Sequence, residues 1–445
     1  MINTTQYKKY SDILDAKSIF SFNGRVEQVA GLCIEANGPC VSVGDACFID
    51  TGDRANPLQA EVVGFKDNRV FLMPLGDMRG LQPGAMIYSN HESLSIPVGE
   101  ELLGRVINGF GEPLDDKGPL LLNTKRSIKT DPPNPMQRKR ILEPLSTGIR
   151  AIDALLTIGK GQRMGIFSGS GVGKSSLLGM IARYTNADVS VIALVGERGR
   201  EVREFIEKDL GEEGLKKSVV IVETGDKPPL RRLNAALAAT TIAEYFRDQG
   251  KDIILMMDSV TRVAMAQREV GLTVGEPPAT KGFTPSVFSF LPKLLERSGS
   301  SEKGTITGFY TVLVEADDFN EPISDAARSI LDGHIVLTRE LASMNHYPAI
   351  DVLESISRVM QDIALDENLI AAQKVREILA AYKEAEDLIN IGAYVKGSNP
   401  KIDFAISKIE DVRNFLMQPL SIGSSFAQSI TEMKQIVETQ DGVNE

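Results

Sequence analysis

Between residues 145 and 365 the chain repeats one pattern, in which a short continuous apolar run is followed by a longer amphipathic segment. Short apolar runs predict strands buried on both faces, and apolar residues spaced three and four apart predict helices. Strands that alternate with helices in this way predict a parallel sheet covered on both faces. The predicted strands are 162–169, 188–196, 218–224 and 252–258, and two predicted helices are 173–185 and 200–211.

Residues 21–95 have a different texture, with short β-prone runs separated by Asn-Gly, Gly-Asp and Pro-Gly pairs. Only short strands fit between turns that frequent, so this part predicts a small β-barrel. Residues 111–120 and 129–140 contain many prolines and predict a connection without regular structure.

After residue 365 the strand pattern stops, and helical spacing predicts three helices at 369–394, 401–418 and 425–440. At the other end, residues 7–16 place Tyr7, Tyr10, Ile13 and Leu14 at helical spacing. This short helix either packs on the first domain or docks a partner.

Composition narrows the class of protein. The net charge of −11 and the isoelectric point near 5.1 argue against a general nucleic-acid binder. No run of 18 apolar residues predicts a membrane span, and the N-terminus does not resemble a secretory signal, so a cytoplasmic protein is expected. Cys33, Cys40 and Cys47 lack a C-x-x-C pair or a nearby histidine, which favours small buried strand positions over a metal site.

One stretch carries the chemistry of a phosphate-binding loop, G-x-x-x-x-G-K-[ST], although Ser168 holds its first glycine position. Lys174 is expected to reach the β- and γ-phosphates, and the Ser175 hydroxyl to ligate Mg²⁺. A glycine-rich turn without a ligand is the alternative, but the preceding strand and the following helix favour a nucleotide site. The expected nucleotide-binding residues here are Ser168, Gly169, Ser170, Gly171, Val172, Gly173, Lys174, Ser175 and Ser176.

Two carboxylates follow predicted strands. Asp258 ends a strand, where it can reach Mg²⁺ through water. Glu197 directly follows another strand, and a carboxylate near the γ-phosphate can serve as a base or orient water. From spacing alone, Glu197 and Arg198 fit an ordinary salt-bridged surface turn equally well.

With these residues the chain resembles the hexameric ATPase family that includes catalytic subunits of rotary ATP synthases and the export ATPases of flagella and type III secretion. The resemblance implies ATP and Mg²⁺ as ligands, a catalytic role for Glu197 with its neighbour Arg198, and packing of Tyr347 against adenine. It also implies that Arg358 is an arginine finger supplied to the adjacent subunit of a homohexamer. The similar segments are 104–120, 143–176, 194–205, 258–270 and 346–360.

Two further stretches, 275–299 and 311–339, resemble the export branch, and 391–406 favours the flagellar enzyme over the virulence-type one. The first contains Lys281, Gly282 and Phe283 in a loop that the resemblance places at the central pore. A contact with substrate or stalk and a purely structural loop remain equally open for it.

The resulting prediction is a multi-domain flagellar export ATPase. Its expected partners are further copies of itself, a flagellar export regulator, stalk and gate proteins, and export chaperone–substrate complexes, with peripheral association at the inner face of the cytoplasmic membrane. Alternatives are an injectisome ATPase, a rotary ATP synthase catalytic subunit, and a non-hydrolysing nucleotide-binding scaffold, although the catalytic set argues against the scaffold. A ring-shaped RNA helicase is disfavoured by the acidic balance. The predicted domains are a partner-docking helix (1–20), a β-barrel (21–95), a RecA-like α/β phosphate-loop ATPase domain (96–365) and a helical domain (366–445).

Overall fold

The computed structural model describes residues 23–53, 56–314 and 321–438. The predicted N-terminal docking helix therefore lies outside the described residues. The chain forms two compact units. Of the described residues, one unit comprises those up to Leu94 together with Glu269–Pro277, and the other comprises those of Ser95–Arg268 and from Pro278 onward. The boundaries predicted at residues 20, 95 and 365 stay predictions.

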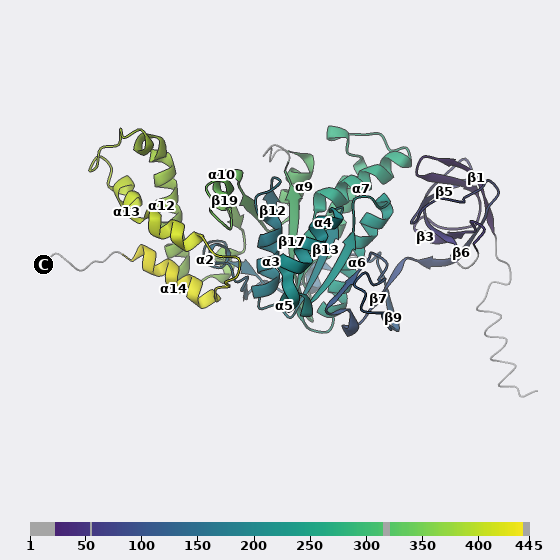
Figure 1. The fold of residues 1–445 in the computed structure, drawn as a ribbon, viewed down its shortest axis with the longest axis horizontal. Helices are drawn as coiled ribbons and strands as arrows, with labels where there is room; N and C mark the ends of the chain where they lie inside the picture. The colour runs from purple at the N-terminus through teal and green to yellow at the C-terminus, as the bar shows by residue number, and fades with distance from the viewer. Residues whose placement is uncertain (1–22, 54–55, 315–320, 439–445) are drawn as a thin grey trace, which may run out of the picture. The chain divides into compact units, whose positions relative to one another are not determined.

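The first unit contains a closed six-stranded antiparallel barrel in the order β1-β2-β5-β4-β3-β6 (Figure 1). Alternate residues such as Ile34, Ile49 and Leu72 point inward and are fully buried, which confirms the predicted barrel. Asp67 and Asn68 join β4 to β5 with positive φ angles, the geometry of a tight hairpin turn. The strands are β1 (Gly24–Ala30), β2 (Cys33–Asn37), β3 (Asp45–Ile49), β4 (Leu58–Lys66), β5 (Arg69–Pro74) and β6 (Met86–Ser93).

The three cysteines are free thiols, and they differ in solvent exposure. Cys33 and Cys47 are buried in strands as expected, and burial raises the pKa of both thiols to about 11. Cys40 corrects the prediction, because it follows the Gly38-Pro39 turn outside any strand and is exposed. Among the described residues no group of His, Cys, Asp and Glu side chains has the arrangement of a metal site.

The second unit is built on a nine-stranded sheet in the order β19-β18-β12-β17-β15-β13-β14-β8, with β16 paired to β17. The strands from β18 to β8 run parallel, and β19 is antiparallel to β18. This confirms the predicted parallel sheet with its strands β12, β13, β14 and β15. The sheet also contains β8, β16, β17, β18 and β19, which were not among the strands predicted from the sequence. The strands are β8 (Arg105–Ile107), β12 (Arg163–Ser168), β13 (Val189–Val195), β14 (Ser218–Glu223), β15 (Asp252–Asp258), β16 (Gly299–Ser300), β17 (Thr305–Leu313), β18 (Gly333–Leu337) and β19 (Ile350–Ser357).

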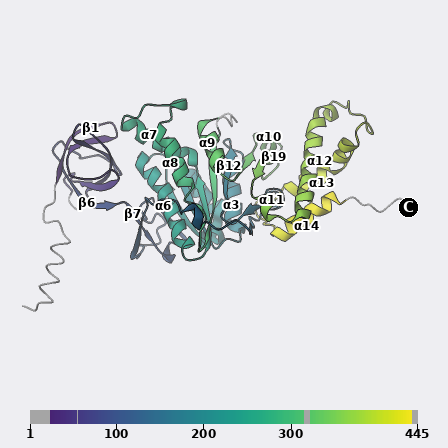
Figure 2. The same cartoon turned by 180° about the vertical axis from the view of Figure 1, so that it is seen from behind.

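Helices cover both faces of this sheet. Ile192, Leu194 and Met256 point to one face and join the apolar cluster that contains Leu178 and Ile181 of α3. Helix α6, whose buried residues lie outside that cluster, packs against β13, β14 and β15. Figure 1 shows α3 on the near side of the sheet, and Figure 2 shows α6 from behind. The α-helices are α2 (Arg150–Leu155), α3 (Lys174–Tyr184), α4 (Gly199–Glu204), α5 (Gly211–Lys216), α6 (Pro229–Arg247), α7 (Val260–Thr273), α8 (Pro285–Leu295), α9 (Pro322–Ile330), α10 (Arg339–Ser343) and α11 (Met360–Ile363).

Several local predictions are refined. The helix expected at 200–211 is α4 followed by a π-helical turn, η3 (Phe205–Leu210), and then α5. The segment 275–299, expected as a loop, contains the short turn η4 (Thr280–Gly282) and all of α8. The proline-rich connection 129–140 holds only the 3₁₀ turn η2 (Pro135–Gln137). Small pairs outside the main sheet are β7 (Ser95–Val98) with β9 (Thr124–Ser127), and β10 (Pro144–Leu145) with β11 (Ile158–Gly159).

The C-terminal part consists of three helices, as predicted: α12 (Asp366–Asn390), α13 (Pro400–Leu416) and α14 (Phe426–Val437). The side chain of Asn399 caps α13, where Pro400 is the first helical residue, and Ser425 caps α14. Apolar residues of all three helices share one hydrophobic cluster with α2 and the sheet. Within the described part of the chain no helix is both long and apolar enough to cross a membrane.

Candidate active site

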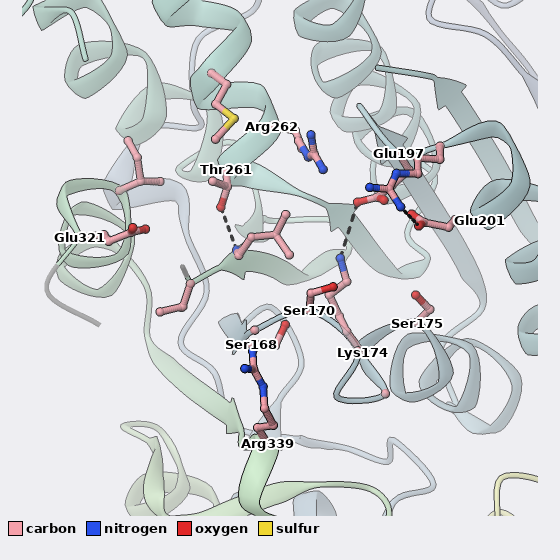
Figure 3. Close-up of a pocket in the computed structure, with 18 of the residues that line it drawn as sticks. Ser168, Ser170, Lys174, Ser175, Glu197, Glu201, Thr261, Arg262, Glu321 and Arg339 are labelled. Carbon is pink, nitrogen blue, oxygen red and sulfur yellow. Dashed lines mark hydrogen bonds and ion pairs between the residues drawn. The ribbon is translucent and has the colours of Figure 1, made fainter. Parts of the chain in front are cut away.

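A cavity of about 840 Å³ opens at the carboxyl edge of the sheet (Figure 3). The parallel strands β12, β13, β15 and β17 all end at this edge, so the residues that follow them come together. Ser168 ends β12, Glu197 follows β13, and Leu313 ends β17. Other lining residues come from the phosphate loop, from α7, from the segment around Lys281, and from the starts of α4, α9 and α10. They include Gly169, Ser170, Gly171, Gly173, Lys174, Ser175, Ser176, Arg198, Glu201, Thr261, Arg262, Arg268, Phe283, Glu321 and Arg339.

The loop between β12 and α3 has the conformation that a phosphate site needs. Gly171 and Gly173 have φ angles of 80° and 89°, which L side chains rarely adopt. A Cβ atom on Gly173 would also lie 3.3 Å from the Tyr347 ring. Within the described part of the chain, the backbone N–H groups from Gly169 to Gly173 have no hydrogen-bond acceptor. Together with the N-terminus of α3 they form a set of donors for an anion.

Ser168 fits the first position of this loop for a structural reason. It is the last residue of β12, in extended backbone, and its carbonyl accepts the N–H of Val314 at 3.0 Å. The loop therefore needs its glycines only after this point. The Ser168 side chain is fully buried, and its hydroxyl has no hydrogen-bond partner among the described residues.

Lys174 lies between two carboxylates. Its Nζ donates to Asp258 Oδ1 at 2.5 Å and lies 3.6 Å from Glu197 Oε1 (Figure 3 draws the second contact). Burial lowers the pKa of Lys174, but the two carboxylates outweigh burial and raise it above its usual value. Lys174 is therefore a permanent cation in the site. Asp258 also accepts a hydrogen bond from the Thr311 hydroxyl at 2.7 Å, which fixes the carboxylate at the end of β15.

Glu197 is a partly buried carboxyl group close to a second carboxylate, Asp258. Burial, and next the nearby charge of Asp258, raise its pKa to about 7, although Lys174 opposes the shift. One of its oxygens, Oε1, has no hydrogen-bond partner among the described residues. A carboxylate with this basicity can accept a proton from water near neutral pH.

The pKa of Glu197 predicts the pH dependence of kcat/KM, which reports on the free enzyme. A protonated Glu197 cannot accept a proton, so kcat/KM should fall as pH drops below about 7. The slope should approach about tenfold per pH unit, as for a single titrating group. Glu201→Ala, which removes a neighbour that raises this pKa, should shift the acid limb to lower pH. A profile that stays flat from pH 8 to pH 5.5 would contradict a titrating Glu197.

Strand β19 places the two remaining candidate residues, Tyr347 and Arg358, at opposite edges of the sheet. Because it runs antiparallel to β18, its first residue, Ile350, pairs with Leu337 at the carboxyl edge, and its last, Ser357, pairs with Gly333 at the amino edge. Tyr347, just before β19, therefore lies beside the phosphate loop, next to Gly173. Arg358 lies at the opposite edge. The two edges are separated by the four-residue step from Gly333 to Leu337 of β18, which is about 13 Å along the strand.

Not every residue predicted for the site contacts the cavity. Val172, Asp258, Tyr347 and Arg358 are not among its lining residues. The Val172 side chain is buried in the apolar cluster. The Ser176 hydroxyl donates to Asp209 at 2.9 Å, so it is engaged by η3. Arg198 lines the cavity with a largely exposed side chain, which donates to Glu201 at 3.4 Å.

Arg262 lines the cavity and was not predicted from the sequence. It lies on the first turn of α7, four residues after Asp258, and its aliphatic part contacts the backbone at Gly196. The signal was present in the sequence, because an arginine one helical turn after a strand-ending aspartate returns to the same sheet edge. Thr261 also lies there and accepts the Leu313 N–H at 2.8 Å (Figure 3).

A glycine-rich loop, a partly buried lysine and two carboxylates at the carboxyl edge of a parallel sheet define a phosphate-loop nucleoside triphosphatase. Family models match three parts of the chain: the ATP synthase alpha/beta family β-barrel domain at residues 26–89, the nucleotide-binding domain of the same family at 148–357, and the C-terminal domain of the type III secretion ATPase EscN at 365–435.

Individual proteins match over nearly the full chain. The flagellum-specific ATP synthase of Bacillus subtilis (strain 168) is 54% identical over 433 residues, which is 97% of this chain and 98% of that protein. The assembled ATPase EscN from the enteropathogenic E. coli type III secretion system superposes with a TM-score of 0.89 at 48% identity, covering 93% of this chain and all of EscN. EscN in complex with its central stalk EscO superposes with a TM-score of 0.87 at 47% identity and the same coverage. The chain belongs to the ATP synthase alpha/beta family, in the branch of flagellum-specific and type III secretion ATPases, and it is an ATPase.

Proposed function

We propose that the cavity binds Mg·ATP with its triphosphate on the phosphate loop. The unpaired N–H groups of Gly169–Gly173 and the N-terminus of α3 support this placement. Ser175 and Asp258 would hold Mg²⁺, which supplies positive charge to the β- and γ-phosphate oxygens. Tyr347 packs beside Gly173 and would contact the adenine. The cavity is large enough for this ligand, at about 840 Å³.

Binding changes the partners of Lys174. Its ammonium neutralises Asp258 and lies near Glu197. When the phosphates bind, Lys174 turns toward them, and Asp258 becomes available to the metal. Glu197 then orients and deprotonates the attacking water. Arg198 and Arg262 add positive charge at the rim and at α7.

The position of Arg358 carries the proposal of a hexamer with shared active sites. Its backbone lies at the amino edge of the sheet, whereas its own phosphate loop lies at the carboxyl edge two strands away. An arginine side chain cannot cover that separation. The guanidinium makes no ion pair within the described residues and is exposed. We infer that it completes the site of the next subunit in a homohexamer, as an arginine finger.

We further propose that hydrolysis in this ring assists the export of flagellar proteins. The flagellar branch is supported by the 54% identity to a flagellum-specific ATP synthase over 97% of this chain, whereas type III secretion ATPases match at 48% over 93% and at 53% over 78%. The complex of EscN with its stalk supports a stalk partner for this chain. A regulator, gate proteins and chaperone–substrate complexes, together with peripheral association at the inner face of the cytoplasmic membrane, complete the proposal.

Two measurements test this function. Turnover per subunit should rise with protein concentration, in parallel with the hexamer fraction in sedimentation, because a monomer lacks the finger. In the bacterium, replacement of the chain by its Lys174→Ala variant should stop secretion of flagellar proteins while other secretion continues. A fully active dilute monomer would contradict the shared site, and unaffected flagellar secretion would contradict the export role.

A further inference from the structure

The backbone of Arg358 is held in place by contacts that involve β19, β18 and β12, whereas its side chain is exposed. Its N–H donates to the carbonyl of Asp332 at 3.0 Å, just before β18. Its guanidinium makes a single hydrogen bond within the described residues, a long one of 3.5 Å to the Arg328 carbonyl. The segment that carries the side chain is thus held while the charged group stays available to another chain.

Asp332 is itself clamped to the start of β12. Arg163 grips its carboxylate with two parallel hydrogen bonds, Nε to Oδ2 at 3.0 Å and the terminal nitrogen to Oδ1 at 3.1 Å. The two backbones also pair, because the Asp332 N–H donates to the Arg163 carbonyl at 2.9 Å. A bidentate arginine–carboxylate pair restricts orientation as well as distance. Asp332 is therefore held in one position relative to the sheet.

Gln162 also contacts Asp332 and, in addition, the residue just before Arg358. Its Nε2 donates to the Asp332 carbonyl at 3.2 Å and to the Ser357 hydroxyl at 3.0 Å. Ser357 in turn donates to the Thr157 carbonyl at 2.9 Å. Gln162 is fully buried, so its amide has no water to replace these partners. The residue immediately before Arg358 is fixed to the residue immediately before β12.

We propose that Asp332 and Gln162 are positioning residues for Arg358, and that they set the geometry of the active site in the neighbouring subunit and not in their own. The inference rests on the proposed finger role of Arg358. Neither residue lines the cavity of its own chain. A shift of about 1 Å in a positioned group costs up to about a hundredfold in rate, so a loosened anchor should reduce turnover without affecting nucleotide binding.

The test is Asp332→Asn, with Gln162→Leu as a second variant that keeps side-chain size. Both should lower kcat by about tenfold to a hundredfold and change the KM for ATP by less than about twofold. Asp115→Asn is the matched control, because Asp115 grips Arg105 at 2.8 and 2.9 Å in the same bidentate way at the start of β8. The control should keep kcat. Melting temperature identifies a variant that does not fold, and sedimentation identifies one that does not assemble. If one of the two variants fails in this way, the kcat of the other tests the proposal.

Mixing subunits separates positioning from a structural defect. An Asp332→Asn subunit keeps an intact phosphate loop, and a Lys174→Ala subunit keeps an intact finger. Mixed hexamers should therefore exceed the summed turnover of the two separate preparations severalfold. Unchanged kcat in both variants, or a loss that mixing does not restore, would overturn the proposal. If Arg358→Ala alone keeps full turnover, the finger role itself fails, which is a different outcome.

Discussion

Glu197→Gln is expected to lower kcat by about 10²- to 10⁴-fold, the range that a positioned general base contributes, while ATP still binds. Glutamine keeps the size of the side chain but cannot accept the proton of the attacking water. Lys174 keeps its hydrogen bond to Asp258, so the phosphate loop is undisturbed. Phosphate release measures kcat, and a fluorescent nucleotide measures the dissociation constant. Glu207→Gln, at an exposed carboxylate paired with Arg203, is the control and should keep its activity.

The same substitution should leave a mark on stability. The folded-state pKa of Glu197 is raised to about 7 from 4.5, so the folded protein binds more protons there than the unfolded chain between these values. The Glu197 contribution therefore destabilises the fold as pH rises through this window. The difference in melting temperature, variant minus unmodified chain, should therefore be more positive at pH 8 than at pH 5. A variant with unchanged turnover would remove Glu197 as the catalytic group, whatever its stability.

Arg358→Ala is expected to lower kcat by about 10³- to 10⁵-fold, the effect of losing an arginine finger. Among the described residues the side chain makes one hydrogen bond, which is long at 3.5 Å, so folding and nucleotide binding should be preserved. Because the finger acts in the neighbouring site, mixing this variant with Lys174→Ala subunits should restore part of the turnover. Arg200→Ala, at an exposed pair with Glu204, is the control.

Two results would contradict this assignment. Turnover close to that of the unmodified chain in Arg358→Ala would show that no finger is needed. A lost activity that mixing never restores would indicate that Arg358 acts within its own subunit, against its position at the amino edge of the sheet.

Much of the fold was predictable because its signals are local. The strands β12, β13 and β15 are continuous apolar runs, and the phosphate loop is a contiguous motif between a strand and a helix. Parallel strands bring their carboxyl ends to one edge, which is why the phosphate loop, Glu197 and Asp258 were expected to belong to one nucleotide site. The roles of Glu197 and Arg198 were not resolved by spacing and depended on the family resemblance.

Other features depend on partners far away in the chain. β8 has only three residues, which is too short to show a period in the sequence. It is a strand because it pairs with β14, for example Ile107 with Ile221. The exposure of Cys40 is decided by the path of the loop after β2, not by its regular spacing from Cys33 and Cys47. Arg262 needed the start of α7 to be known before its side chain could be placed at the cavity.

The sequence by itself determined the phosphate loop, the strand-ending carboxylates and the order of the domain types, because each depends on residues adjacent in the chain. Only the tertiary structure decided that Lys174 lies between Asp258 and Glu197, and that burial gives Glu197 a pKa near neutrality. It also decided that the antiparallel strand β19 carries Tyr347 to its own phosphate loop and Arg358 away from it. The direction of one edge strand relative to its neighbour sets both positions, and strand direction is a property of long-range hydrogen bonding that no local pattern encodes.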